Sequence, residues 1–293
     1  MPQCTSFLPG VQRSYSFAGC EFEYCDATYV LFGAPFDATT SFRPGTRNGP
    51  RAIREMSWNF EFYLPEYDLE MSDIPIYDGG DVGLPVVDEQ MAAEIAEYTT
   101  QIVADKKIPI ILGGEHSITI GTLAAVKPVW YIVCDAHLDL REEFRGSRFN
   151  HGCPSRRACE MLDNRVIIIG ARSGDREQFL YAKEYIHLYD ADTVLKRGIT
   201  AVIEEIQKIV KDEAVYLSID ADVIDCCLTP ALGTPEPFGL TPQDIKHVIA
   251  AFAPQSVAFD YVEVTDGDQG QTAAVAVVLI REFLARHWLA QPR

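Results

Sequence analysis

The heptapeptide Cys134-Asp135-Ala136-His137-Leu138-Asp139-Leu140 follows a short apolar run, residues 129–133, that is rich in β-branched and aromatic side chains. Such a run predicts a buried strand that ends where the polar residues begin. While the backbone stays extended, Asp135, His137 and Asp139 fall at alternate positions and therefore share one face. Carboxylates and an imidazole that converge in this way predict a ligand set for a metal ion.

Two further apolar runs end in the same kinds of residue. Residues 108–112 precede Gly113-Gly114-Glu115-His116-Ser117, and residues 214–219 precede Asp220-Ala221-Asp222. In open parallel sheets ligands bind outside the carboxyl ends of the strands, so these groups can meet although they are far apart in sequence. The three strand ends offer two histidines and four aspartates, which are too many for one ion. Two dications about 3.5 to 4 Å apart, bridged by carboxylates and a water, could use all six.

The rest of the chain alternates between strand and helix patterns, which predicts an α/β fold with a parallel sheet covered by helices on both faces. Further strands are expected at 29–34, 74–82, 165–170, 186–189 and 256–262. Helices are expected at 50–58, 88–106, 117–126, from 156 onward, and at 176–184, 199–212, 242–252 and 273–287. Asp88 and Ser117 are predicted to be the N-caps of their helices. No linker divides the chain, so residues 1–293 are expected to form one domain, with an irregular N-terminal segment at 1–25.

The composition restricts the classes of function. There are 25 basic and 43 acidic side chains, so the net charge is −18, which argues against a nucleic-acid or anionic-membrane partner. No apolar segment reaches the roughly 18 to 20 residues of a membrane span and no signal-peptide pattern is present, so a cytoplasmic location is expected. The eight cysteines form no Cys-x-x-Cys pair, which favours reduced thiols over a disulfide framework or a zinc ribbon.

The three motifs, in this order and with Gly233-Thr234-Pro235-Glu236-Pro237 downstream, resemble those of the ureohydrolase family of arginases and agmatinases. The resemblance extends from about Gly33 to the C-terminal helix. It implies a three-layer α/β/α domain with an eight-stranded parallel sheet, and an assembly of three or six identical chains. It also implies two Mn²⁺ ions, one held by His116, Asp135, Asp139 and Asp220 and the other by His137, Asp135, Asp220 and Asp222.

Glu263 and His151 complete the site that the resemblance implies. Glu263 follows the strand expected at 256–262 and matches the family glutamate that grips the guanidinium nitrogens, for which a carboxylate has a suitable bidentate geometry. His151 matches the family histidine beside the site, which is thought to carry the product proton. Alternatively, Glu263 could form a structural ion pair with an arginine. His151 could line the loop without any catalytic role. Asp225 is expected to have a structural role.

The reaction that the resemblance implies is the attack of a metal-bridging hydroxide on a guanidinium carbon, followed by the release of urea. The charges of the implied metal centre suit a cationic substrate. The +4 of two dications and the −4 of four aspartates cancel, so the hydroxide leaves the metal centre with a net charge near −1. A guanidinium stays protonated at neutral pH and is attracted to such a centre. Metal binding also lowers the pKa of water towards roughly 7, so that a nucleophile is available.

The loops beside the motifs favour agmatine as the small cationic guanidino substrate, with putrescine and urea as products. Residues 35–47 and 138–157 resemble agmatinases rather than arginases, whose loop is rich in serine and asparagine. Residues 35–47 could instead form a rigid turn beneath the site. Glu142 and Glu143 could face the far amine of agmatine or be solvated. The alternative functions are hydrolysis of another guanidino compound, such as guanidinobutyrate or arginine, and polyamine binding by a catalytically silent homologue.

Overall fold

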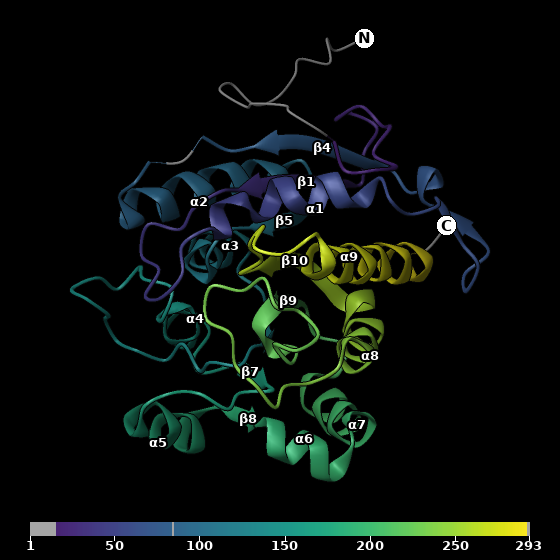
Figure 1. The fold of residues 1–293 in the computed structure, drawn as a ribbon. Helices are drawn as coiled ribbons and strands as arrows, with labels where there is room; N and C mark the ends of the chain where they lie inside the picture. Colours follow the sequence, from purple (N-terminus) through teal and green to yellow (C-terminus); the bar gives the residue numbers. More distant parts are fainter. Residues whose placement is uncertain (1–15, 84, 292–293) are drawn as a thin grey trace.

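One eight-stranded sheet forms the centre of the molecule in the computed structural model, which describes residues 16–83 and 85–291 (Figure 1). Its strands are β1 (Tyr29–Ala34), β4 (Ile76–Asp81), β5 (Ile108–Gly113), β6 (Trp130–Cys134), β7 (Val166–Ile169), β8 (His187–Tyr189), β9 (Val215–Asp220) and β10 (Ser256–Val262). They are arranged in the order β4-β1-β5-β10-β9-β6-β7-β8, and all neighbours are parallel. The predicted eight-stranded parallel sheet is confirmed.

Helices cover both faces of the sheet, as predicted for a three-layer α/β/α fold (Figure 1). One layer consists of α1 (Gly49–Ser57), α6 (Ala191–Arg197), α7 (Ile199–Val210), α8 (Pro242–Phe252) and α9 (Gln271–Ala290). The other consists of α2 (Asp88–Ala104), α3 (Thr119–Val126), α4 (Pro154–Met161) and α5 (Arg176–Tyr185). Shorter elements are the 3₁₀ turns η1 (Thr46–Asn48), η2 (Met71–Asp73), η3 (His116–Ile118), η4 (Ala221–Val223) and η5 (Ala253–Gln255), and a hairpin of β2 (Tyr63–Leu64) and β3 (Leu69–Glu70).

Successive residues of each strand pack into different cores. In β6, Ile132 belongs to the core beneath α7, α8 and α9, whereas Tyr131 and Val133 belong to the core beneath α3, α4 and α5. All three side chains are fully buried. Because both faces of the sheet are covered, both sets of positions are apolar, and this explains why the strands appear in the sequence as continuous apolar runs.

The register of the sheet brings the ends of four central strands to one level. Cys134 in β6 pairs with Ile219 in β9, and Asp220 in β9 pairs with Val262 in β10. Strand β5 lies on the other side of β10. The residues that follow these four strands therefore gather at one edge, which is where the sequence predicts the metal site.

Both predicted N-caps are wrong. Asp88 is the first residue of α2, after Val87 in the N-cap position, and its carboxylate accepts hydrogen bonds from Glu89 N (2.9 Å) and from the Ser147 hydroxyl. Ser117 lies inside η3, and its hydroxyl donates to the carboxylate of Glu115 (2.6 Å) instead of capping α3. None of these hydrogen bonds is the one that an N-cap side chain accepts from the backbone N–H of the second or third helical residue.

Other elements begin elsewhere or were not predicted. Helix α4 begins at Pro154 rather than at 156, and α6 was not predicted, although Asp190 caps it by accepting from Thr193 N (2.7 Å). The β2–β3 hairpin was not predicted either. Residues 16–25 contain no helix or strand, in agreement with the predicted irregular segment, of which 1–15 lie outside the described residues.

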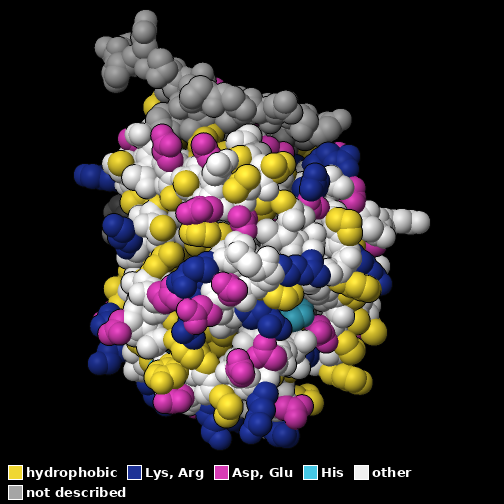
Figure 2. Space-filling model, turned by 90° about the vertical axis from the view of Figure 1, so that its left-hand side faces the viewer, with side chains coloured by type: hydrophobic (Ala, Val, Ile, Leu, Met, Phe, Trp, Pro, Cys, Tyr) yellow, Lys and Arg dark blue, Asp and Glu magenta, His cyan; other side chains and the backbone are white. Residues whose placement is uncertain are grey.

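The distribution of charged side chains and the character of the helices are relevant to which macromolecules or membranes the protein can contact. Figure 2 shows acidic and basic side chains interspersed on one face of the molecule, so the net charge of −18 is not gathered there into one patch. Within 16–83 and 85–291, none of the helices combines the length and the apolar character that crossing a membrane requires.

Replacement of Gly114 by alanine should disrupt the approach of the loop after β1 to the end of β5. A Cβ atom there would lie 2.0 Å from Phe36 O and 2.6 Å from Phe36 N, and neither backbone atom can move freely. We expect Gly114→Ala to lower the free energy of unfolding by about 3 kcal/mol, measured by urea denaturation. Gly146→Ala is the control, because Gly146 faces open space and only its positive φ of 82° would be strained, at about 1 to 2 kcal/mol. Equal losses in the two variants would contradict the steric argument.

Candidate active site

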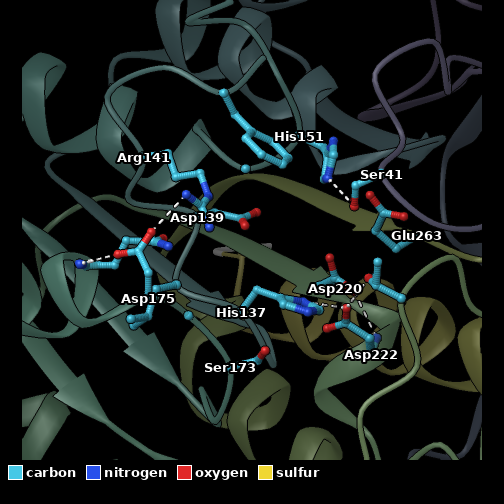
Figure 3. A pocket seen from close by; sticks show the side chains of 16 residues that line it. Ser41, His137, Asp139, Arg141, His151, Ser173, Asp175, Asp220, Asp222 and Glu263 are labelled. Carbon is cyan, nitrogen blue, oxygen red and sulfur yellow. Dashed lines mark hydrogen bonds and ion pairs between the residues drawn. The ribbon is translucent and has the colours of Figure 1, made fainter.

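A cavity of about 350 Å³ lies at the carboxyl edge of the sheet (Figure 3). Six of the eight predicted site residues line it: His137, Asp139, His151, Asp220, Asp222 and Glu263. The other two, His116 and Asp135, are buried in contact with these. The remaining lining residues are Ser41, Leu138, Arg141, Phe144, Gly152, Ser173, Gly174, Asp175, Gln178 and Thr234. The structure therefore brings together all eight predicted metal, substrate and catalytic residues.

The first group of possible metal ligands surrounds His116. Its Nδ1 atom lies 3.1 Å from Asp135 Oδ2 and 3.2 Å from Asp220 Oδ2. Asp139 Oδ2 is 3.4 Å from the same nitrogen. These side chains come from the ends of β5, β6 and β9, so the three predicted segments converge on one point.

The second group surrounds His137. Its Nδ1 atom lies 2.9 Å from Asp222 Oδ2 and 3.7 Å from Asp135 Oδ1. Asp135 belongs to both groups and presents one carboxylate oxygen to each, as expected of a bridging ligand. Glu236 Oε1 lies 3.5 Å from His137 Nε2, so the motif that contains Glu236 also reaches the site.

The ring of His116 is oriented from behind. Its Nε2 atom lies 3.1 Å from Ser218 Oγ and 3.2 Å from Tyr131 Oη, and these contacts fix which nitrogen faces the carboxylates. His116 Nδ1 and Asp135 Oδ2 are both buried and neither makes a hydrogen bond among the described residues. Buried polar atoms are almost always satisfied, so this pair of atoms is suited to bind a cation.

The carboxylates are crowded enough to disturb their own ionisation. Burial and the charge of Asp135 raise the pKa of Asp139 to about 6. Burial, with the charges of Asp222 and Asp135, raises the pKa of Asp220 well above its usual range. Burial would also raise the pKa of Asp135, but the interactions with the neighbouring His116 and His137 side chains outweigh it and lower that pKa. A bound cation would remove this mutual repulsion.

Glu263 occupies a strained position at the end of β10. Its φ of 64° is in the left-handed region, which a side chain of this size rarely adopts, and its carboxylate accepts a hydrogen bond from His116 N (2.8 Å). Burial, together with the charge of Glu115, raises its pKa well above the usual range. Among the described residues it is paired with this backbone group and not with an arginine, so the predicted alternative of a structural ion pair is not what the structure contains.

His151 lies beside Ser41 in the cavity wall, whereas His137 and Asp222 lie lower in the view of Figure 3. Its Nε2 atom is 3.2 Å from Ser41 Oγ, and its ring meets the Phe144 ring edge to face, with centroids 5.7 Å apart. Burial, with the charge of His137, lowers the pKa of His151 to about 4. The imidazole is therefore neutral at pH 7 and faces the cavity with one nitrogen.

The acidic loop residues that the sequence suggested for the far end of the substrate are not the ones that line the cavity. Neither Glu142 nor Glu143 lines the cavity, and both are exposed, which agrees with the solvated alternative. Besides the predicted site residues, the acidic residue that lines it is Asp175, whose Oδ2 lies 2.8 Å from Arg141 Nη1. Asp175 was missed, although it follows the carboxyl end of β7 and the rule used for the other strands would have found it.

Asp225, Cys226 and Cys227 form a third group of potential ligands. The carboxylate of Asp225 accepts hydrogen bonds from Cys227 N (2.9 Å) and Gly239 N (3.0 Å), and so ties two loop segments together. Cys227 is exposed, in contrast to the buried histidine groups. This agrees with the predicted structural role of Asp225.

A sequence model described as the Arginase family matches residues 27–285. The chain belongs to the arginase family. The prediction from the three motifs is thus confirmed, and this member of the arginase family is a ureohydrolase.

Several relatives of known name cover most of the chain. An agmatinase of Pyrococcus horikoshii is 38% identical over 258 residues, which are 85% of this chain and 88% of the relative. An N(1)-aminopropylagmatine ureohydrolase of Thermococcus kodakarensis is 37% identical, over 85% of this chain and 86% of the relative. The crystal structure of agmatine ureohydrolase of Thermoplasma volcanium has a TM-score of 0.89 and 36% identity, and the match covers 93% of this chain and 94% of that one. The predicted similarity to agmatinases is therefore confirmed.

Divalent cations should stabilise this arginase-family protein through the buried groups around His116 and His137. We expect removal of cations by EDTA to lower the unfolding temperature and added MnCl₂ to restore it, because a ligand at 100 times its dissociation constant stabilises the folded state by about 2.7 kcal/mol. Thermal unfolding with and without Mn²⁺ measures the effect.

Two variants show whether the histidine–aspartate groups or the Asp225 group cause the Mn²⁺-dependent shift of the unfolding temperature. Asp135→Asn should lose most of the Mn²⁺-dependent shift, since Asp135 belongs to both histidine groups. Asp225→Asn is the matched control and should keep the shift, since its carboxylate is already engaged by backbone N–H groups. A full Mn²⁺ shift in Asp135→Asn would contradict the assignment.

Proposed function

We propose that this ureohydrolase hydrolyses agmatine to putrescine and urea. The observation that carries the proposal is the pair of buried histidine–aspartate groups that share Asp135 and underlie a cavity also lined by Glu263 and His151. The two relatives at 37 and 38% identity, one named agmatinase and the other N(1)-aminopropylagmatine ureohydrolase, support a substrate of this class.

The donor atoms fit manganese. Carboxylate oxygens and imidazole nitrogens without thiolates favour Mn²⁺ or Mg²⁺ over softer metals, and the unpartnered His116 Nδ1 and Asp135 Oδ2 mark where a cation is needed. When bound, two Mn²⁺ ions would supply a nucleophile by lowering the pKa of water. The residues that would hold them are His116, Asp135, Asp139 and Asp220 for one ion, and His137, Asp135, Asp220 and Asp222 for the other.

Glu263 would orient the guanidinium. A carboxylate can accept two parallel N–H bonds from this planar group, and Glu263 is held at the cavity wall by His116 N. The guanidinium, whose pKa exceeds about 12, enters as a cation, and the carboxylates of the site attract it. Binding it would also relieve the unfavourable burial of the Glu263 carboxylate.

His151 would move a proton. The bond between the guanidinium carbon and the alkylamine nitrogen breaks as the water oxygen bonds to that carbon, and the leaving nitrogen must gain a proton. A neutral imidazole with Nε2 towards the cavity can accept a proton from the water and deliver it to the amine. Its low pKa favours rapid release of that proton.

The far end of the substrate would face Asp175 rather than Glu142 or Glu143. Apart from Glu263, Asp175 is the acidic residue of the cavity wall that is outside the two histidine groups, and its partner Arg141 packs on the Phe144 ring, 4.7 Å from its centroid. An acidic side chain there suits the second cation of agmatine. Agmatine with an aminopropyl extension, as in the substrate named for one relative, is the second candidate substrate.

The assembly of three or six chains and the cytoplasmic location stay predictions.

Loss of one histidine ligand should abolish the reaction. We expect His137→Ala to release no urea from agmatine in the presence of saturating Mn²⁺, because the second group would lose its nitrogen ligand. A colorimetric urea assay measures this. Glu143→Gln is the control and should retain kcat/KM within about twofold, which is about 0.4 kcal/mol, because Glu143 lies outside the cavity. Full activity of manganese-loaded His137→Ala would refute the proposed site.

The choice of substrate can be measured with the same assay. We expect kcat/KM for agmatine to exceed that for arginine and for guanidinobutyrate by at least about tenfold, or about 1.4 kcal/mol, since both compounds bring a carboxylate to the end of the cavity near Asp175. N(1)-aminopropylagmatine belongs in the same panel. A preference for arginine would contradict agmatine, and bound Mn²⁺ without urea from any of these compounds would favour a silent binding protein.

A further inference from the structure

A buried carboxylate that belongs to neither histidine group lies behind His151. Glu115 is 0% exposed, and Thr39, on the loop after β1, lies between it and the imidazole. We propose that Thr39, held by Glu115, is a positioning residue that fixes the neutral His151 ring with its proton on Nδ1 and its Nε2 lone pair towards the cavity. This inference rests on the proposed proton-transfer role of His151.

Thr39 is anchored by two hydrogen bonds to one side chain. Its backbone N–H donates to Glu115 Oε2 (2.9 Å) and its hydroxyl donates to Glu115 Oε1. The Ser117 hydroxyl also donates to Glu115 Oε1 (2.6 Å). A carboxylate that receives three donors acts as an acceptor towards all of them, so the single proton of the Thr39 hydroxyl is directed at Glu115.

The lone pairs of Thr39 Oγ1, which can accept hydrogen bonds, face His151. The backbone N–H of His151 donates to it (3.0 Å), and His151 Nδ1 lies 3.1 Å from it. Since the hydroxyl proton is already used, Oγ1 can only accept, and Nδ1 must carry the hydrogen. The two contacts occupy both lone pairs of Thr39 Oγ1, so this oxygen has no hydrogen-bonding capacity left.

The consequence appears on the other side of the ring. With the proton on Nδ1, a neutral His151 has its lone pair on Nε2, which faces the cavity and lies 3.2 Å from Ser41 Oγ. The Phe144 ring packs edge to face against the imidazole and limits its rotation. Glu115 thus prepares His151 to accept a proton without touching the substrate itself. Without Thr39, the imidazole would be free to place its proton on either nitrogen.

A purely structural role for Thr39 makes a different prediction. In that case its hydroxyl would only fasten the loop after β1 to Glu115, and its loss would lower stability without changing the reaction selectively. Thr39→Val removes the hydroxyl but keeps the backbone bond from Thr39 N to Glu115, so the loop retains one anchor. Thr39→Ser restores the hydroxyl. The neighbouring Thr40 offers a matched control, because its hydroxyl donates to Asp37 O (2.9 Å) and not to His151.

Steady-state kinetics of the manganese-loaded protein with agmatine provide the first test. We expect Thr39→Val to lower kcat by at least about tenfold, as part of the 10² to 10⁴ that general acid–base catalysis contributes, with KM unchanged within about twofold. Thr39→Ser should recover kcat to within about threefold of the parent, and Thr40→Val should keep it within about twofold. An unchanged kcat in Thr39→Val would overturn the proposal, even if agmatine hydrolysis itself is established.

The position of the proton can be measured without turnover. Nitrogen-15 NMR of histidine-labelled protein, with Mg²⁺ in place of paramagnetic Mn²⁺ and with His151→Ala to assign the signal, should show His151 protonated at Nδ1. This result is expected whichever guanidino compound is the substrate, so it separates failure of the positioning role from failure of the agmatine assignment. A proton on Nε2 in the parent protein would overturn the proposal, whether or not Thr39→Val folds.

A double-mutant cycle shows whether Thr39 acts through His151. If it does, Thr39→Val combined with His151→Ala should have the same kcat as His151→Ala alone, within about twofold. A further loss in the double variant equal to that of Thr39→Val alone would mean that the two residues act independently, and would contradict a positioning role.

Discussion

The repulsion among buried carboxylates is the constraint on which the active site depends. Asp135, Asp139, Asp220 and Asp222 lie around two histidines at one edge of the sheet, almost without access to water. Such a cluster is unfavourable unless positive charge balances it. The sheet cannot relax to avoid the cost, because its register fixes where the strands end. The fold therefore holds these groups in place, and a cluster of carboxylates fixed in this way favours the binding of cations.

The sequence predicted the parts of the molecule that depend on local signals. The apolar runs gave the strands, with Tyr29–Ala34 at its observed bounds, and helix Pro242–Phe252 was likewise placed correctly. The convergence of the six histidine and aspartate residues followed from one rule, that the carboxyl ends of parallel strands share an edge. Each of these inferences needed only a short window of sequence and the topology of an α/β sheet. The family resemblance was needed to connect His151 and Glu263 with the same site.

The features that were missed depend on partners far away in the chain. Ser117 looked like an N-cap because that motif is local, yet the buried carboxylate of Glu115 captures its hydroxyl. The bond between Thr39 and His151 joins residues 112 positions apart, and no periodicity reveals it. Glu142 and Glu143 were candidates for the substrate because they are acidic and near the motif, but the direction of a loop side chain is set by tertiary packing. In the loop at 35–47, Thr39 lies behind His151 and Ser41 lines the cavity, so neighbouring residues of one loop differ in their access to the site.

The alternation of strand residues between two separate cores limits how a protein of this kind can vary. A single residue inserted between Ile132 and Val133 in β6 would turn Val133 into the wrong core and Asp135 away from His116, because a shift of one position reverses every side chain that follows it in the strand. Insertions and deletions are therefore confined to the connections between strands. Beyond the few residues that directly follow the strands and supply the ligands, the connections at the carboxyl edge can lengthen or shorten, so one rigid scaffold can acquire new pocket shapes around an unchanged centre.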